Sequence, residues 1–194
     1  IKRLKQMQEN GAKRALLISA TGTGKTYAAA FALRDMKPQR ALFLVHREII
    51  LKQARKSFKK VFGDTKSLGL YTGSTKELDR DFIFATMQTM IKHYTEFAKD
   101  SFDVVVVDEA HRAGADGYQE IMEYFTPKFM LGMTASPDRL DGFDVYKTFD
   151  YNIAHEIRLQ EAMRLNLLCP FNYYGITDLF VNGQKKENRE FENL

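Results

Sequence analysis

The sequence predicts a three-layer α/β domain with a mostly parallel central sheet. Short apolar runs alternate along the chain with longer amphipathic stretches, and polar or turn-forming residues bound each run. Strands that are buried on both faces of a parallel sheet give such continuous apolar runs, and strand–helix alternation is typical of doubly wound sheets. The expected strands are Ala15–Ala20, Ala41–Val45, Asp81–Thr86, Val104–Val107 and Phe129–Thr134, with a weaker one at Ser67–Tyr71.

The stretches between these runs carry apolar residues at helical spacing, as in Ile50, Ala54, Phe58 and Val61. A stripe of this kind predicts helices that pack one face on the sheet. After Pro137 the pattern weakens. The expected helices are Thr26–Met36, Glu48–Phe62, Met87–Lys99, Tyr118–Tyr124 and a short Arg158–Leu165, followed by an extended Leu168–Ile176 and a polar, frayed end at Asn182–Leu194.

Composition narrows the classes of protein. A chain of 194 residues suits one α/β domain, and its net charge of +4 is compatible with a polyanionic partner. Cys169 is the single cysteine, which excludes an intramolecular disulfide and a cysteine-based metal site. No apolar run approaches the roughly 20 residues of a membrane span, so we expect a cytoplasmic protein without membrane contact. Because the chain opens at Ile1 in a stretch typical of a helix, we expect a piece of a longer protein.

A glycine-rich segment follows the first expected strand and opens the first long helix. It reads Ser19-Ala20-Thr21-Gly22-Thr23-Gly24-Lys25-Thr26, which is typical of a phosphate-binding P-loop. Its glycines allow backbone N–H groups to turn toward phosphate oxygens, Lys25 reaches the β- and γ-phosphates, and Thr26 offers a hydroxyl to Mg²⁺. The strict pattern begins with Gly where this chain has Ser19, a change that is tolerated if the backbone there is extended. The alternative is a glycine-rich turn with an incidental lysine. The expected nucleotide-binding residues are Thr21, Gly22, Thr23, Gly24, Lys25 and Thr26.

Four consecutive valines run into Asp108-Glu109-Ala110-His111. Two carboxylates at the end of a buried strand are costly to desolvate unless a cation meets them, and Mg²⁺–ATP supplies one. We expect Asp108 to hold Mg²⁺ and Glu109 to orient and deprotonate the attacking water, with Lys25 as the third catalytic residue. The spacing of 83 positions from Lys25 leaves room for the two strands to lie side by side. The alternative is a strand end with solvated acids.

Several motifs in order resemble those of superfamily 2 helicases of the DEAH type, from Ala12 to Leu140. Leu44–Arg47 resembles motif Ia, Ala85–Thr89 the segment that touches the nucleic acid strand, and Gly132–Arg139 the run that contains motif III. Asp108–Gly114 is similar to bacterial helicases and to type I restriction-type translocases. The resemblance implies a RecA-like P-loop NTPase fold.

Further expectations come from the resemblance alone. It implies a first RecA-like domain at 1–155, a linker at 156–194, and a second RecA-like domain elsewhere in the full-length chain. It implies an ATP-dependent motor on nucleic acid, with DNA favoured over RNA, that hydrolyses ATP poorly without the arginine finger of the second domain. The implied coupling residues are His111, Thr134 and Ser136, and the implied nucleic-acid contacts are His46, Arg47, Thr86 and Gln88.

The segment from Arg34 to Lys66 contains ten basic residues and three acidic ones. Most of those on the helix Glu48–Phe62 are interpreted as a solvated face, and Arg47 is the better contact candidate. Tyr173 and Tyr174 are interpreted as packing residues. Two further hypotheses remain open: a P-loop ATPase switch that acts on protein partners without nucleic acid, and a regulatory domain with a vestigial site.

Overall fold

The computed structural model describes residues 1–138, 142–169, 179–181 and 184–186. Its main body is a seven-stranded sheet in the order β3-β4-β2-β5-β6-β1-β7, and every neighbouring pair of strands is parallel. This confirms the predicted parallel α/β fold. The strands are β1 (Arg14–Ser19), β2 (Ala41–Val45), β3 (Leu68–Tyr71), β4 (Phe82–Thr86), β5 (Val104–Asp108), β6 (Phe129–Thr134) and β7 (Ile153–Ile157).

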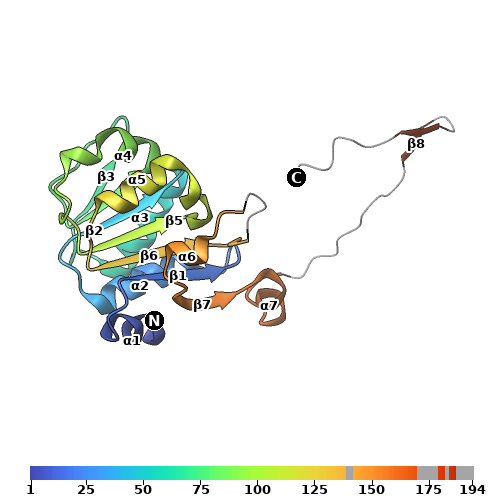
Figure 1. The fold of residues 1–194 in the computed structure, drawn as a ribbon, viewed down its shortest axis with the longest axis horizontal. Helices are drawn as coiled ribbons and strands as arrows, with labels where there is room; N and C mark the ends of the chain where they lie inside the picture. Colours follow the sequence, from blue (N-terminus) through green and yellow to red (C-terminus); the bar gives the residue numbers. More distant parts are fainter. Residues whose placement is uncertain (139–141, 170–178, 182–183, 187–194) are drawn as a thin grey trace.

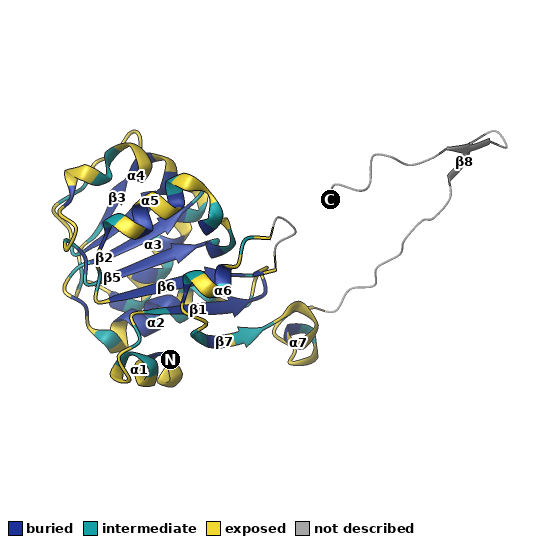
Figure 2. Ribbon diagram, in the orientation of Figure 1, coloured by how far each residue is buried: buried dark blue, intermediate teal, exposed yellow. Residues whose placement is uncertain are grey.

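Helices cover both faces of the sheet and give the three predicted layers (Figure 1). The strands between them are buried along most of their length (Figure 2). One core cluster joins the sheet to the first three helices, and a second joins it to the next three. The first layer holds α1 (Lys2–Glu9), α2 (Lys25–Met36) and α3 (Glu48–Phe62), and the second holds α4 (Met87–His93), α5 (Asp116–Tyr124) and α6 (Val145–Thr148), with the 3-10 turns η1 (Tyr94–Glu96) and η2 (Ala110–Gly114).

Aromatic rings hold α3 against the sheet. The ring of Phe58 lies 5.3 Å from that of Phe43 on β2 and 5.1 Å from that of Phe84 on β4, both edge to face. Phe62 meets Phe82 at 5.0 Å in the same geometry. Such pairs contribute about 0.5–1.5 kcal/mol each beyond the burial of their area. They fix α3, and therefore the residue at its start, relative to the ends of β2 and β4.

Gly132 on β6 makes room for the buried ring of Phe149, which belongs to the same core cluster as α4, α5 and α6. A Cβ placed on Gly132 would lie 2.3 Å from Cζ of Phe149, whose side chain is fully buried. Only glycine therefore allows Phe149 to pack against the middle of the sheet.

The chain after β6 differs most from the prediction. β7 and α6 were not expected, because β7 is an edge strand with a mixed burial pattern and α6 has one turn. β7 extends two residues beyond the boundary predicted at 155. The short helix is confirmed as α7 (Leu159–Arg164). The predicted helix Met87–Lys99 is shorter, since α4 ends at His93 and η1 follows it.

Two short strands lie near the C-terminus. β8 (Leu179–Val181) and β9 (Gln184–Lys186) pair in antiparallel orientation, so the expectation of a frayed end is wrong for 184–186. Residues 170–178, which include Tyr173 and Tyr174 and most of the extended stretch predicted at Leu168–Ile176, lie outside the described residues. In the described part of the chain, the helices are too short or too polar to cross a membrane.

Candidate nucleotide site and nucleic-acid interface

The glycine-rich segment forms the turn between β1 and α2. Gly22 and Gly24 have backbone φ angles of 87° and 89°, a conformation that residues other than glycine rarely adopt. Ser19, at the place of the first glycine of the pattern, is the last residue of β1 and has no positive φ, so the change is tolerated as expected. Its hydroxyl lies 2.5 Å from that of Thr23, a contact that closes the base of the loop. Thr21 is exposed and Thr26 is half-buried in the first turn of α2.

Lys25 opens α2 and bends back into the turn. Its Nζ donates to the carbonyl oxygens of Ser19 at 2.8 Å and Ala20 at 3.4 Å. Burial lowers the pKa of this ammonium group, while the nearby charges of Asp108 and Glu109 act in the opposite direction. The P-loop lysine and the acidic pair, 83 positions apart in the sequence, are therefore close enough in space to interact.

The acidic pair stands at the end of β5. Asp108 is 8% exposed and accepts a hydrogen bond from the backbone N–H of Glu109 at 3.0 Å. Burial raises the pKa of Asp108 to about 6, and the charge of Glu109 adds to this, while the N–H bond and Lys25 lower it. Glu109 has φ 54°, a left-handed conformation that is uncommon outside glycine and is frequent at functional sites. A buried carboxylate whose charge is only partly compensated suits a cation ligand.

The donor set fits Mg²⁺. Among the described residues no group of three or more His, Cys, Asp or Glu side chains could hold a metal ion by itself. Mg²⁺ differs from zinc in keeping several waters and in taking one or two protein oxygens together with phosphate oxygens. Thr26 and Asp108 offer two such oxygens.

The three predicted coupling residues form one connected group with Glu109. Nδ1 of His111 lies 3.1 Å from Oγ1 of Thr134 and 3.2 Å from Oε2 of Glu109. The backbone N–H of Ser136 donates to the same Thr134 oxygen at 3.2 Å. The end of β6 is thus bonded to the acidic motif.

The order of the strands corrects one expectation. β1 and β5 do not lie side by side, because β6 pairs with both of them. The interposed strand is the one that brings the Thr134 hydroxyl between the two motifs.

The four predicted nucleic-acid contacts also lie at this edge of the sheet. β2 and β4 are neighbours, with Val45 opposite Thr86, so His46 and Arg47 follow one strand where Gln88 follows the other. Arg47 and Gln88 are exposed, and His46 is half-buried. Thr86 is 6% exposed, and its hydroxyl accepts from the Thr89 N–H as the N-cap of α4. Thr86 therefore fixes the start of α4 rather than presenting a free hydroxyl.

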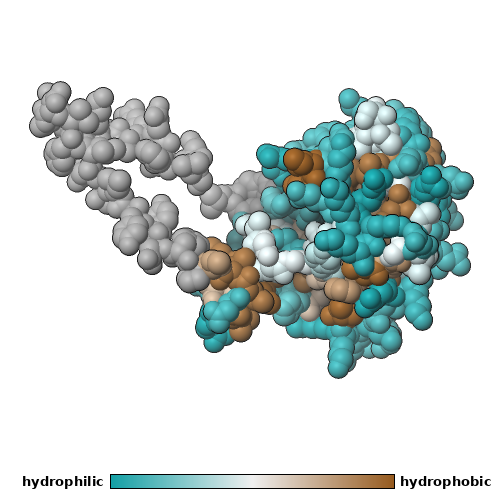
Figure 3. Space-filling model, turned by 180° about the vertical axis from the view of Figure 1, so that it is seen from behind, coloured by the Kyte–Doolittle hydropathy of each residue, from teal (hydrophilic) through white to brown (hydrophobic). Residues whose placement is uncertain are grey.

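Sequence reasoning missed Leu168. The N–H of Ala20 donates to the Ile157 carbonyl at 2.9 Å, so β7 follows β1 up to the P-loop and the chain leaves the sheet there. A Cβ on Gly22 would lie 3.1 Å from Cδ2 of Leu168. An apolar surface continues beside this contact over α7 and the residues that follow it, seen in brown next to the grey trace in Figure 3. It includes the exposed side chains of Leu159, Leu165 and Leu167.

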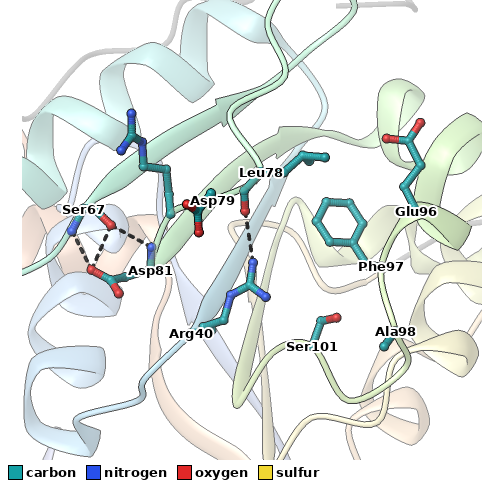
Figure 4. Close-up of a pocket in the computed structure, with 10 residues that line it drawn as sticks. Arg40, Ser67, Leu78, Asp79, Asp81, Glu96, Phe97, Ala98 and Ser101 are labelled. Carbon is teal, nitrogen blue, oxygen red and sulfur yellow. Dashed lines mark hydrogen bonds between the residues drawn. The ribbon is translucent and has the colours of Figure 1, made fainter.

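A cavity of about 500 Å³ lies at the opposite end of the sheet (Figure 4). Two of its charged groups are held by the protein itself: Arg40 donates to the Leu78 carbonyl, and Asp81 accepts from the N–H and hydroxyl of Ser67. It is remote from the P-loop edge and has no part in the candidate site.

The parallel sheet, the P-loop and the acidic motif at the end of β5 define a P-loop NTPase domain of the RecA-like type. Residues 1–139 match the family described as "Type III restriction enzyme, res subunit", and the chain belongs to this family. It is a first RecA-like domain of a superfamily 2 helicase. The match covers more than half of the chain.

Individual relatives support this family assignment. The chain is 31% identical over 177 residues to the type I restriction enzyme EcoAI endonuclease subunit of Escherichia coli, covering 84% of this chain and 21% of the relative. It is 24% identical to the DNA 3'-5' translocase XPB2 of Sulfurisphaera tokodaii, over 94% of this chain and 40% of the relative. A solved structure of the Type ISP restriction-modification enzyme LlaGI with a DNA substrate mimic matches with a TM-score of 0.63 and 16% identity, over 85% of this chain and 20% of that one. This structural likeness shows the fold alone.

The chain spans about a fifth to two fifths of the length of these curated relatives. Relatives of this kind are ATP-dependent helicases and translocases, which does not favour a switch that acts on protein partners.

Proposed function

We propose that this chain binds Mg²⁺–ATP and couples its hydrolysis to movement on nucleic acid, as the first motor domain of a longer protein. One observation carries the proposal: the P-loop after β1 and the acidic pair at the end of β5 lie at the same edge of the sheet where Arg47 and Gln88 are exposed. A nucleotide site and a candidate phosphodiester contact thus share one rigid scaffold. The helicase and translocase names of the relatives support the same function.

The residues of the nucleotide site have distinct roles. Backbone N–H groups of Thr21–Thr26 hold the phosphates, and the Lys25 ammonium moves from its own loop carbonyls to the β- and γ-phosphate oxygens. Thr26 and Asp108 hold Mg²⁺, which neutralises phosphate charge when bound. Glu109, partly exposed beside the buried Asp108, orients the attacking water and accepts its proton.

Coupling runs through the end of β6. His111 contacts both Glu109 and Thr134, so a change in the hydrogen bonds of Glu109 during hydrolysis reaches Thr134 and the Ser136 N–H. The second RecA-like domain of the full-length protein responds to this change. It also supplies an arginine, a group worth about 10³–10⁵ in rate in related NTPases, so the chain alone hydrolyses ATP slowly.

On the nucleic-acid side, His46, Arg47 and Gln88 contact the phosphodiester backbone, and Thr86 contributes by capping the helix that carries Gln88. DNA is preferred to RNA, in keeping with the DNA translocase and restriction enzyme among the relatives. Residues 1–155, together with the last two residues of β7, form the ATP-binding domain, the residues after them lead toward the second domain, and the protein acts in the cytoplasm.

Two titrations test this function. Lys25→Ala is expected to abolish binding of a fluorescent ATP analogue in the presence of Mg²⁺, whereas Glu109→Gln retains binding and removes the residual hydrolysis. Unchanged affinity in Lys25→Ala would count against the nucleotide site. Anisotropy of labelled single-stranded DNA, duplex DNA and RNA, with parent and Arg47→Ala/Gln88→Ala chains, tests the nucleic-acid half. A parent chain that binds none of the three would refute it.

A further inference from the structure

The outward side of α3 carries a stripe of cations. Its buried face is Leu51, Ala54, Phe58 and Phe62. Lysines at positions 52, 56, 59 and 60 recur at i, i+4, i+7 and i+8, which places them along one side of the helix away from that face. All four are exposed. The face of the molecule that α2 and α3 cover is largely hydrophilic (Figure 3).

The stripe ends at a hollow beside the open edge of the sheet. A cavity of about 500 Å³ lies between α3 and the start of β3, which is the first strand of the sheet. Lys66 is held at this place by a hydrogen bond from its Nζ to the Gln39 carbonyl at 3.1 Å. The charged residues that line the hollow are Arg55, Lys56, Lys59, Lys66 and Asp64.

Carboxylates of the protein neutralise only part of this charge. Lys52 pairs with Glu48 at 2.7 Å, and Lys59 pairs with Asp64. Arg55 meets Glu77 only at 3.7 Å. Exposed pairs of this kind contribute about 0–1 kcal/mol, so a phosphate can replace any of these three carboxylates at little cost. The stripe and the hollow together contain six cationic side chains, and three carboxylates pair with them.

A bound polyanion would gain most from Lys56 and Lys60. Neither makes an ion pair within the part of the chain that the structure describes. Both point from the side of α3 farthest from its buried face. A polyanion that lies along the helix meets these two charges without displacing any protein carboxylate.

The geometry favours the backbone of a duplex over a single strand. Proteins that hold single strands combine positive charge with aromatic side chains on which bases stack. The two aromatic residues of α3, Phe58 and Phe62, are buried in the core. The four lysines of α3 form a row about 12 Å long, from Lys52 to Lys60, which matches about three to four phosphates of one strand at roughly 3.4 Å each.

The position of α3 connects this surface to the motor site. The helix begins after Arg47, the exposed residue at the end of β2. From there it runs to the hollow at the start of β3. We propose that the outward side of α3 and this hollow bind the phosphodiester backbone of duplex DNA that adjoins the segment held at Arg47 and Gln88. The proposal rests on the proposed function and adds to it a second, duplex-binding contact remote from the nucleotide.

Salt-dependent binding tests the surface directly. Anisotropy of a labelled 30-base-pair duplex is measured between 50 and 200 mM salt for the parent and for Lys56→Gln/Lys60→Gln, a change that keeps helix propensity nearly constant. Loss of two phosphate contacts reduces the steepness of log K against log salt by about 1.8, where K is the association constant for the duplex. The ratio of the parent's K to the variant's K is therefore expected to grow about tenfold as salt falls from 200 to 50 mM. The matched control is Lys13→Gln/Lys92→Gln, which removes two exposed lysines outside α3. Melting temperature and Mg²⁺–ATP affinity are expected to equal those of the parent in both variants.

The outcomes distinguish failure of the α3 surface from failure of the proposed motor function. If the α3 variant keeps the parent slope while Arg47→Ala/Gln88→Ala weakens binding, the α3 surface is refuted and the motor function stands. An equal loss in the Lys13/Lys92 control refutes it too, because net charge alone then explains the effect. If the α3 variant loses binding to phosphatidylserine vesicles but not to the duplex, the surface recognises anionic lipid instead. A parent that binds no nucleic acid overturns both.

Discussion

Replacing Asp108 with asparagine is expected to stabilise the nucleotide-free chain while it abolishes use of Mg²⁺–ATP. The pKa of Asp108 is raised from 3.8 to about 6, chiefly by burial. The folded chain therefore binds this proton more tightly than the unfolded chain does, and stability is lost as pH rises from about 4 to about 6. At 1.36 kcal/mol per pH unit the charged carboxylate costs the folded state up to roughly 3 kcal/mol above that window.

Asp108→Asn removes this cost and keeps the side-chain oxygen that accepts the Glu109 N–H. At pH 8 the free energy of unfolding is expected to rise by up to roughly 3 kcal/mol, or roughly 6–12 °C in melting temperature for a chain of this size. At pH 5 the gain falls to about half, because the parent carboxyl group is then mostly protonated in the folded state. Stabilisation by Mg²⁺–ATP is expected in the parent and is expected to disappear in Asp108→Asn.

Urea unfolding of the nucleotide-free chain at pH 5 and pH 8 measures both effects. Asp35→Asn is the matched control, since Asp35 is an exposed carboxylate on α2 and its neutralisation changes the net charge equally. A loss of stability in Asp108→Asn at pH 8, or a gain of the same size at both pH values, would show that burial of the charge is not what raises this pKa.

Three further predictions concern residues around the site. Gly132→Ala is expected to lower the free energy of unfolding by about 1–3 kcal/mol in urea, because its Cβ collides with the ring of Phe149, and adding Phe149→Leu is expected to recover part of the loss. Thr86→Ala is expected to cost about 1 kcal/mol through loss of the α4 cap, whereas Thr86→Ser retains stability and nucleic-acid affinity. Labelling of the exposed Cys169 thiol is expected to slow on addition of Mg²⁺–ATP, because the adjacent Leu168 lies against the P-loop; an unchanged rate would place this segment away from the bound nucleotide.

The parts of the fold that the sequence predicts are those with a strong local signal. The valines of β5 and the apolar runs of β1, β2, β4 and β6 appear as strands at nearly the expected bounds, because central strands of a parallel sheet must be apolar on both faces. The P-loop was predictable for a similar reason. Its glycines are required by positive φ angles at two positions, and that requirement is local to the turn.

Features that depend on distant contacts were not predictable. β7 is an edge strand whose residues are only partly buried, so it lacks the apolar run of its neighbours. The contact of Leu168 with Gly22 joins positions 146 residues apart and leaves no mark in either local pattern. The capping role of Thr86, by contrast, had a local signal, a threonine directly before a helix, while the nucleic-acid contact that the resemblance implies there stays a prediction.

The position of β6 between β1 and β5 explains how two motifs can act as one site. Ile18 of β1 pairs with Thr134, and Asp108 of β5 pairs with the adjacent Met133, so β6 fixes the P-loop and the acidic pair in register. A slip of one residue would turn the Thr134 side chain to the opposite face of the sheet and break its contact with His111. Direct pairing of β1 with β5 would bring the phosphate and acidic motifs together equally well but would leave no residue between them. In the proposed function, the inserted strand links the hydrolysis site to Thr134 and Ser136, the predicted coupling residues.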